Sequence, residues 1–138
     1  ALTAKSTDDQ TMLMGVSTAQ AIAPPLLKLN YNNDKDLVPV AFTGAVPNVL
    51  VVAANSPANS VDDLIKLLKS KPGQLNFASS GAGSTQHIAA ELFKDLAKVD
   101  AVHVPYKGSG PAMIDLIAGQ VQYAFDSRWK IKSSRRCK

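Results

Sequence analysis

The sequence predicts an α/β fold, with a parallel-rich sheet flanked by helices. From Ser60 onward, helical segments alternate with short apolar strands in the order α-β-α-β-α-β, which is typical of parallel strands joined by crossover helices. The run Val49-Leu50-Val51-Val52 is continuously apolar, as expected of a strand buried on both faces. Pro72-Gly73 and Gly119 supply the stop signals after two of the helices.

The first third of the chain is predicted to hold a buried strand, a short helical turn, a polar loop and a second strand. In chain order these elements are Thr11–Val16, Ala21–Leu27, Asn30–Asp36 and Leu37–Ala45. Ser17-Thr18-Ala19-Gln20 offers capping side chains for the helical turn, and Pro24-Pro25 keeps that turn short.

The remaining elements alternate regularly. They are a strand at Val49–Ala54, a helix with Ser60 as its N-cap, a strand at Leu75–Ala78, a helix at Ile88–Ala97, a strand at Ala101–Val104, a helix at Ala112–Ala118 and a strand at Val121–Phe125. Ligands of such sheets bind outside the carboxyl ends of the strands. Three segments reach that edge: Ser79–His87, Pro105–Pro111 and Asp126.

The charge of the chain is unevenly distributed. Its 138 residues, enough for one domain or parts of two, carry a formal net charge of +4. The last twelve residues, Ser127–Lys138, hold six of the fifteen basic residues and no acid. Nine basic and eleven acidic residues remain, so the body of the protein is mildly acidic. The 46% apolar content is typical of a globular protein.

The basic tail shows neither a strand period nor a helix period over any useful length. We interpret it as non-native or disordered sequence, with an arm that binds nucleic acid or an acidic surface as the alternative. Cys137, the only cysteine, has no ligand partner at metal-binding spacing. No apolar run approaches the ~18 residues of a membrane helix, and the first residues do not resemble a signal peptide.

The most informative segment is Ser79–His87, which reads Ser-Ser-Gly-Ala-Gly-Ser-Thr-Gln-His. Small residues at a strand-to-helix turn leave backbone N–H groups free, and the helix macrodipole adds about half a positive charge there. The pattern favours a site for a carboxylate or phosphate, although it matches neither the P-loop nor the dinucleotide fingerprint. The alternative is a tight connection that needs glycine for steric reasons alone.

Residues with catalytic potential occur in these loops without a recognisable catalytic arrangement. Ser80, Ser84 and His87 could suggest a nucleophile and a base, but the Gly-x-Ser-x-Gly spacing is absent. His87 is interpreted as a capping or packing residue, and His103, inside a strand, as structural. Two isolated histidines and scattered acids supply neither a metal cluster nor a carboxylate pair for acid–base work.

Several strings of residues are specific in combination. They are Pro-Asn-Val-Leu-Val-Val at 47–52, Lys-Pro-Gly-Gln-Leu-Asn-Phe-Ala-Ser-Ser-Gly-Ala-Gly-Ser at 71–84, His87 with Glu91-Leu92-Phe93, Val-His-Val-Pro-Tyr-Lys-Gly-Ser-Gly-Pro-Ala at 102–112 and Leu-Ile-Ala-Gly-Gln-Val at 116–121. From about Ala4 to Asp126 the chain resembles the extracytoplasmic solute receptors of tripartite tricarboxylate transporters, the Bordetella uptake gene (Bug) family.

The resemblance implies a periplasmic-binding-protein-like (type II) fold, two α/β lobes joined by crossing strands, of which this chain holds a part. Residues 1–53 would belong to the first lobe and include the first connecting strand. Residues 54–120 would form the second lobe, 121–126 the second connecting strand and 127–138 the basic tail.

The resemblance also implies which residues bind a ligand. A first-lobe loop at Ser17–Gln20 would face the cleft, and the loop from Ser79 to Thr85 would hold a ligand carboxylate. Asp126 matches a family aspartate at the hinge. The predicted ligand-binding residues are Ser17, Thr18, Ser79, Ser80, Gly81, Ala82, Gly83, Ser84, Thr85 and Asp126. No catalytic residue, metal or cofactor is expected.

Members of this family are longer, and their segments before Ala1 and after Asp126 have no counterpart here. We therefore expect uncovered sheet edges and apolar faces, which favour self-association of the chain.

The favoured interpretation is a periplasmic, non-enzymatic receptor that works with membrane transporter subunits and recognises a dicarboxylate, tricarboxylate or aromatic carboxylate. No nucleic acid is expected as a partner. One alternative is a small α/β hydrolase or transferase that uses Ser84 and His87. A second is a module that binds nucleic acid or a partner protein through the basic tail.

Overall fold

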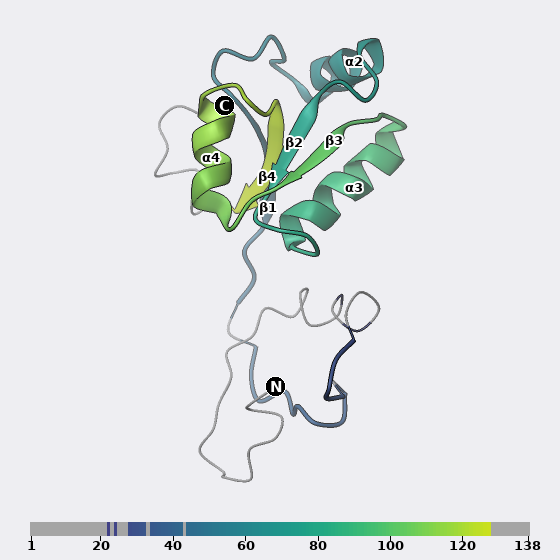
Figure 1. The fold of residues 1–138 in the computed structure, drawn as a ribbon, viewed down its shortest axis with the longest axis vertical. Coiled ribbons are helices and arrows are strands. Elements are labelled where there is room, and N and C mark those ends of the chain that lie inside the picture. Colours follow the sequence, from purple (N-terminus) through teal and green to yellow (C-terminus); the bar gives the residue numbers. More distant parts are fainter. Residues whose placement is uncertain (1–21, 23, 25–27, 33, 43, 128–138) are drawn as a thin grey trace. The chain divides into compact units, whose positions relative to one another are not determined.

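The computed structural model describes residues 22, 24, 28–32, 34–42 and 44–127 (Figure 1). The chain divides into two units, residues 1–45 and residues 46–138. The predicted strand Thr11–Val16, the loop Ser17–Gln20 and the tail after Ser127 lie outside the described residues. The boundaries of the two predicted lobes remain a prediction.

A mixed four-stranded sheet forms the centre of the second unit. Its strands are β1 (Asn48–Val52), β2 (Asn76–Ser79), β3 (Val102–Pro105) and β4 (Tyr123–Ser127), in the spatial order β1-β4-β2-β3. β2 runs parallel to both β3 and β4, while β1 pairs with β4 in the antiparallel direction. The predicted α/β class with a parallel-rich sheet is confirmed.

Three helices cover the two faces of this sheet (Figure 1). They are α2 (Val61–Ser70), α3 (Thr85–Ala97) and α4 (Ser109–Ile117). Buried residues of α2 and α3 pack with Phe77 and Tyr123, whereas buried residues of α4 pack with Ala78 and Ala124. Because successive strand residues point to opposite faces, one face carries the aromatic rings and the other carries the alanines.

Capping side chains decide where two of the helices begin. Ser60 was predicted as the N-cap of α2, and its hydroxyl accepts a hydrogen bond of 3.1 Å from the N–H of Asp63. α3 begins at Thr85, three residues before the predicted start, because Ser84 caps it and accepts from the N–H of His87 at 3.3 Å.

Two more element boundaries differ from the prediction. α4 begins at Ser109 rather than Ala112, since Gly108 takes the N-cap position with a φ of 111°, a conformation that favours glycine. β4 continues to Ser127, because Val49 and Asn48 of β1 pair with Asp126 and Ser127. Asp126 therefore lies inside the last strand rather than just after it.

The predicted strand Leu37–Ala45 is wrong for the residues described there, which form no strand. Val38, Val40 and Phe42 are 83%, 79% and 85% exposed. An apolar alternation becomes a strand only when a neighbouring strand takes its backbone N–H and C=O groups, and no such pairing occurs within the described part of the chain.

Candidate functional site

The glycine loop between β2 and α3 is held by hydrogen bonds of its own. The N–H of Gly81 donates to Ser79 Oγ at 3.2 Å, and the N–H of Ser84 donates to the carbonyl of Gly81 at 3.2 Å. The N–H of Gly83 donates to His87 Nδ1 at 3.2 Å. Gly81 and Gly83 have φ values of 139° and 75°, which glycine adopts without strain.

These hydrogen bonds determine which backbone N–H groups of the loop can donate to a ligand. The N–H groups of Gly81, Gly83 and Ser84 are used within the loop, so the expectation that they are free is wrong. A helix start leaves its first N–H groups without helical partners, and the cap uses that of His87. The N–H groups of Thr85 and Gln86, the first two helical residues of α3, are the remaining candidates.

A second helix N-terminus lies next to this loop. The N–H of Gly108 donates to the carbonyl of Ser80 at 3.2 Å, and the N–H of Tyr106 donates to the carbonyl of Ser79 at 3.0 Å. α4 starts directly after Gly108 without a side-chain cap. The positive ends of two helices therefore converge at the carboxyl edge of β2, as the predicted loops Ser79–His87 and Pro105–Pro111 required.

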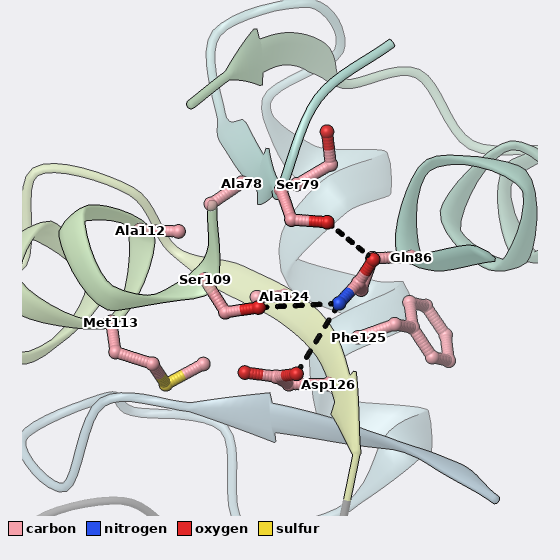
Figure 2. A pocket seen from close by; sticks show the side chains of 10 residues that line it. Ala78, Ser79, Gln86, Ser109, Ala112, Met113, Ala124, Phe125 and Asp126 are labelled. Carbon is pink, nitrogen blue, oxygen red and sulfur yellow. Dashed lines mark hydrogen bonds between the residues drawn. The ribbon is translucent and has the colours of Figure 1, made fainter. Parts of the chain in front are cut away.

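Gln86 connects the parts of this site and was not among the predicted residues. Its Oε1 accepts a hydrogen bond of 2.7 Å from Ser80 Oγ. Its Nε2 donates to Ser109 Oγ at 3.4 Å and to Asp126 Oδ1 at 3.3 Å (Figure 2). The signal for Gln86 in the sequence is its place two residues after the N-cap serine of α3, and the predicted helix start at Ile88 hides that signal.

Asp126 is the charged residue of the site and is 1% exposed. Its Oδ1 also accepts from the N–H of Ser127 at 2.7 Å. The structure thus brings Asp126 together with the predicted residues Ser79 and Ser80. Ala82 and Thr85 belong to the same loop and helix start, whereas Ser17 and Thr18 lie outside the described residues.

A small pocket opens among these groups (Figure 2). Half of its lining is polar and half is apolar. The lining residues are Ala78, Ser79, Ser80, Gln86, Ser109, Ala112, Met113, Ala124, Phe125 and Asp126. A site of this kind, with two helix N-termini and apolar walls, suits a small anion that has a carbon skeleton.

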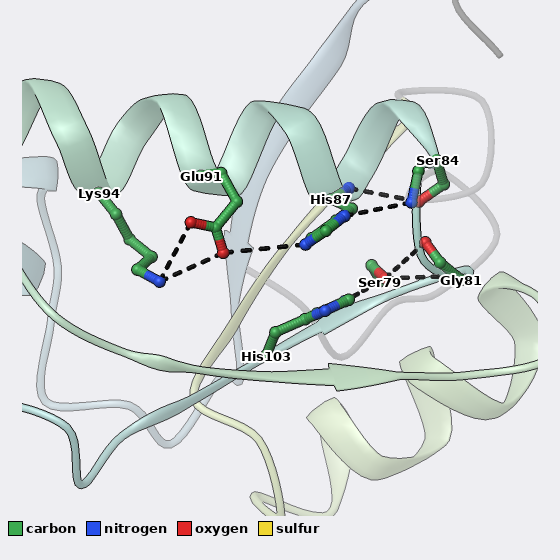
Figure 3. A network of polar contacts seen from close by, with 8 residues as sticks. Ser79, Gly81, Ser84, His87, Glu91, Lys94 and His103 are labelled. Carbon is green, nitrogen blue, oxygen red and sulfur yellow. Dashed lines mark hydrogen bonds and ion pairs between the residues drawn. The ribbon is translucent and has the colours of Figure 1, made fainter. Parts of the chain in front are cut away.

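Both histidines pack next to this loop (Figure 3). Their rings stack with centroids 3.9 Å apart, and His103 Nε2 lies 2.6 Å from Ser79 Oγ. Burial lowers the pKa of His103, and the neighbouring His87 lowers it further. Lys94 pairs with Glu91 at 3.2 Å, and Glu91 lies 3.8 Å from His87 Nε2.

These contacts bear on the catalytic alternative. Ser84 Oγ contacts the backbone N–H of His87, while the ring nitrogen Nδ1 of His87 accepts from Gly83. Ser84 and His87 are thus not arranged as a nucleophile and its base. Ser79 and His103 do form a serine–histidine contact, which sequence reasoning missed because the two residues are far apart in the chain. Ser79 is only 2% exposed, and the described residues place no carboxylate against His103 to orient it.

Among the described residues there is no cluster of three or more His, Cys, Asp or Glu side chains that could hold a metal ion. In the same part of the chain, no helix has both the length and the apolar character needed to cross a membrane.

Comparison with known proteins gives a consistent result. Residues 1–134 match the family model described as the tripartite tricarboxylate transporter family receptor, TctC. Protein BugT of Bordetella pertussis is 41% identical over 122 residues, which cover 86% of this chain and 37% of BugT. The chain spans about a third of the length of the curated relatives it matches.

Solved structures are similar as well. MatC from Rhodopseudomonas palustris, with bound malate, is 35% identical with a TM-score of 0.68, over 80% of this chain and 36% of MatC. R. palustris Rpa4515 with adipate is 38% identical with a TM-score of 0.60, over 64% of this chain and 31% of that protein.

Proposed function

We propose, since the chain belongs to the tripartite tricarboxylate transporter receptor family, that its pocket recognises one carboxylate of a small organic acid. The observation that carries the proposal is the convergence of the N-termini of α3 and α4 at a pocket with apolar walls. Malate and adipate, the ligands named for two solved relatives, are both dicarboxylates, which supports this ligand class.

The geometry suggests how the carboxylate is held. Each helix N-terminus carries about half a positive charge and presents N–H groups without helical partners. The N–H groups of Thr85 and Gln86 from α3 and of Gly110 from α4 lie at these two starts. A carboxylate between them takes hydrogen bonds from both helices and needs no Lys or Arg side chain.

The family supports the wider biological setting. A receptor of this kind delivers its ligand to membrane subunits of a transporter, so we place this protein outside the cytoplasm, in the periplasm. The arrangement of Ser84 and His87 described above supports binding without turnover. We therefore expect no saturable hydrolysis of ester, amide or phosphoester substrates.

The direct test is a titration of the full chain with malate and with adipate, followed by two-dimensional amide NMR, which detects even millimolar binding. Binding is expected to shift the amide signals of Thr85, Gln86 and Gly110 and to leave those of α2 unchanged. The diamides of the two acids serve as uncharged controls of similar shape. Absence of any shift with both acids, or equal shifts with the diamides, would overturn the proposal.

A further inference from the structure

Asp126 presents a buried acceptor that the described residues leave unused. Its Oδ1 takes two hydrogen bonds, from the N–H of Ser127 and from Gln86 Nε2. Its Oδ2 is fully buried and has no hydrogen-bond partner among the described residues. A buried carboxylate oxygen without a donor costs free energy, so this position suits a donor group, which a water or a bound molecule supplies.

Gln86 determines which oxygen of Asp126 is left over. Ser80 Oγ donates to Gln86 Oε1 at 2.7 Å, which orients the amide so that Nε2 faces Ser109 and Asp126 Oδ1. Figure 2 shows the other carboxylate oxygen turned away from Gln86, toward Met113. Oδ2 therefore faces the apolar part of the pocket lining, which contains Met113 and Ala112.

The charge of Asp126 limits what can sit there. A ligand carboxylate placed directly against Oδ2 would bring two negative charges together in a buried setting, which is unfavourable. A hydroxyl or an ammonium group has the opposite effect, because it donates a hydrogen bond to Oδ2. A carboxylate at the helix N-termini and a donor at Asp126 are compatible only if the ligand carries both groups close together.

We propose that this pocket selects small acids with a hydroxyl or ammonium group on the carbon next to a carboxylate, and that this group donates to Asp126 Oδ2. The inference rests on the proposed function, because it assumes that a carboxylate binds at the starts of α3 and α4. Asp126 is the specificity-determining residue. Gln86 is a positioning residue, which acts by holding Oδ1.

Three probes with the same carbon chain test the inference: succinate, malate and aspartate. The full chain is titrated with each by amide NMR. Malate or aspartate is expected to bind at least about tenfold more tightly than succinate, the scale of one hydrogen bond to a charged group. The tighter of these two identifies the donor as hydroxyl or ammonium. Equal affinities for all three would overturn the inference and leave the proposed function standing. No binding by any of them would overturn the inference, and the titration with adipate would then decide whether the proposed function stands.

Two variants test whether Asp126 causes the preference for malate or aspartate over succinate. Asp126→Asn keeps the size of the side chain and removes its charge, so malate or aspartate should fall to within about threefold of succinate. The matched control is Asp95→Asn, which removes the charge of an exposed acid paired with Lys98 on α3 and should keep the preference. A preference retained in Asp126→Asn would overturn the assignment.

Gln86→Ala gives a second, independent readout. Without Gln86 the carboxylate of Asp126 is free to rotate, so the preference for the donor-bearing acid should fall while succinate affinity changes little. This variant carries the test if Asp126→Asn fails to fold, which circular dichroism would show. An unchanged preference in Gln86→Ala would contradict the positioning by Gln86.

Discussion

The two faces of the sheet differ in their buried aromatic rings. On the face covered by α2 and α3, Leu64, Leu68, Phe77 and Tyr123 are almost completely buried and fill the space. On the face covered by α4, the pocket with Asp126 borders a cluster of buried residues that contains no aromatic ring: Val51, Ala78, Ala112, Leu116, Val121 and Ala124. The same sheet thus has one face that packs around Phe77 and Tyr123 and one face, without buried aromatic rings, that borders the pocket of Asp126.

This difference shows where ligand space comes from. Strand order and helix starts bring polar groups to the carboxyl edge of the sheet. The pocket at that edge lies on the face where the residues of the central strands, Ala78 and Ala124, are small. Substitutions on the face covered by α2 and α3, the first face, should therefore change the free energy of unfolding. Substitutions on the face covered by α4, the second face, should change ligand binding more than the free energy of unfolding.

The largest expected effect is a loss of stability on the sheet face that α2 and α3 cover. Phe77→Ala removes a fully buried ring that stacks on His103 and Tyr123, with centroid distances of 4.9 and 5.5 Å. The free energy of unfolding should fall by about 3–5 kcal/mol in a denaturant titration. Phe42→Ala, at a position 85% exposed, is the matched control and should change it by less than about 0.5 kcal/mol. Similar losses in the two variants would show that the first face is not the stable core.

The second prediction concerns a substitution that fills the pocket. Ala124→Leu adds three carbon atoms at a 2% exposed pocket residue, so it should abolish carboxylate binding and cost about 1–3 kcal/mol of stability through overpacking. Ala90→Leu makes the same change at a fully buried position on the other face. That control should lose comparable stability yet keep its affinity, as measured by NMR titration of the folded protein. Loss of binding in both variants would remove the distinction between the faces.

Much of the fold could be predicted from the sequence, because it follows from local patterns. The alternation of strands and helices, the N-cap at Ser60 and the meeting of two loops at one edge depend on nearby residues and were predicted correctly. The strand predicted at Leu37–Ala45 depended on a partner strand, which a local pattern cannot supply.

The candidate site was only partly predictable for a related reason. The glycine loop could be recognised by its composition. Which of its N–H groups stay free also depends on His87, because the His87 ring accepts a hydrogen bond from the N–H of Gly83. The contact between Gln86 and Asp126 joins residues 40 positions apart. Such contacts depend on how whole helices and strands pack. The sequence therefore predicted that the site lies at the carboxyl edge of the sheet, but not that Gln86 connects Ser80, Ser109 and Asp126 there.

A smaller effect is expected at the two capped helices. Ser60→Ala and Ser84→Ala each remove the hydroxyl that accepts an N–H at a helix start, so each should cost about 1 kcal/mol of unfolding free energy. Only Ser84→Ala should also weaken carboxylate binding, because α3 borders the pocket and α2 does not. Calorimetry or NMR titration on both variants compares them directly. Equal affinities in the two variants would argue against α3 as part of the carboxylate site.

The smallest effect expected is a pH dependence that arises on the aromatic face. The ring of His103 stacks on Phe77 and His87, and its surroundings also include Glu91 and Lys94. Burial and the neighbouring His87 lower the pKa of His103 below its usual 6.5. The unfolded chain therefore takes up the proton first as pH falls, so the contribution of His103 to stability is complete above pH 6.5 and declines below it.

Denaturant titrations between pH 7.5 and 5.5 should thus show a modest loss of stability on acidification, since carboxylates titrate mainly below this range. His103→Gln, which stays neutral throughout, should flatten the profile. The chain contains only two histidines, so NMR titration of their ring signals can be assigned with the same variant. A His103 pKa above 6.5, or stability that rises as the solution is acidified, would show that the aromatic face does not disfavour the charged ring.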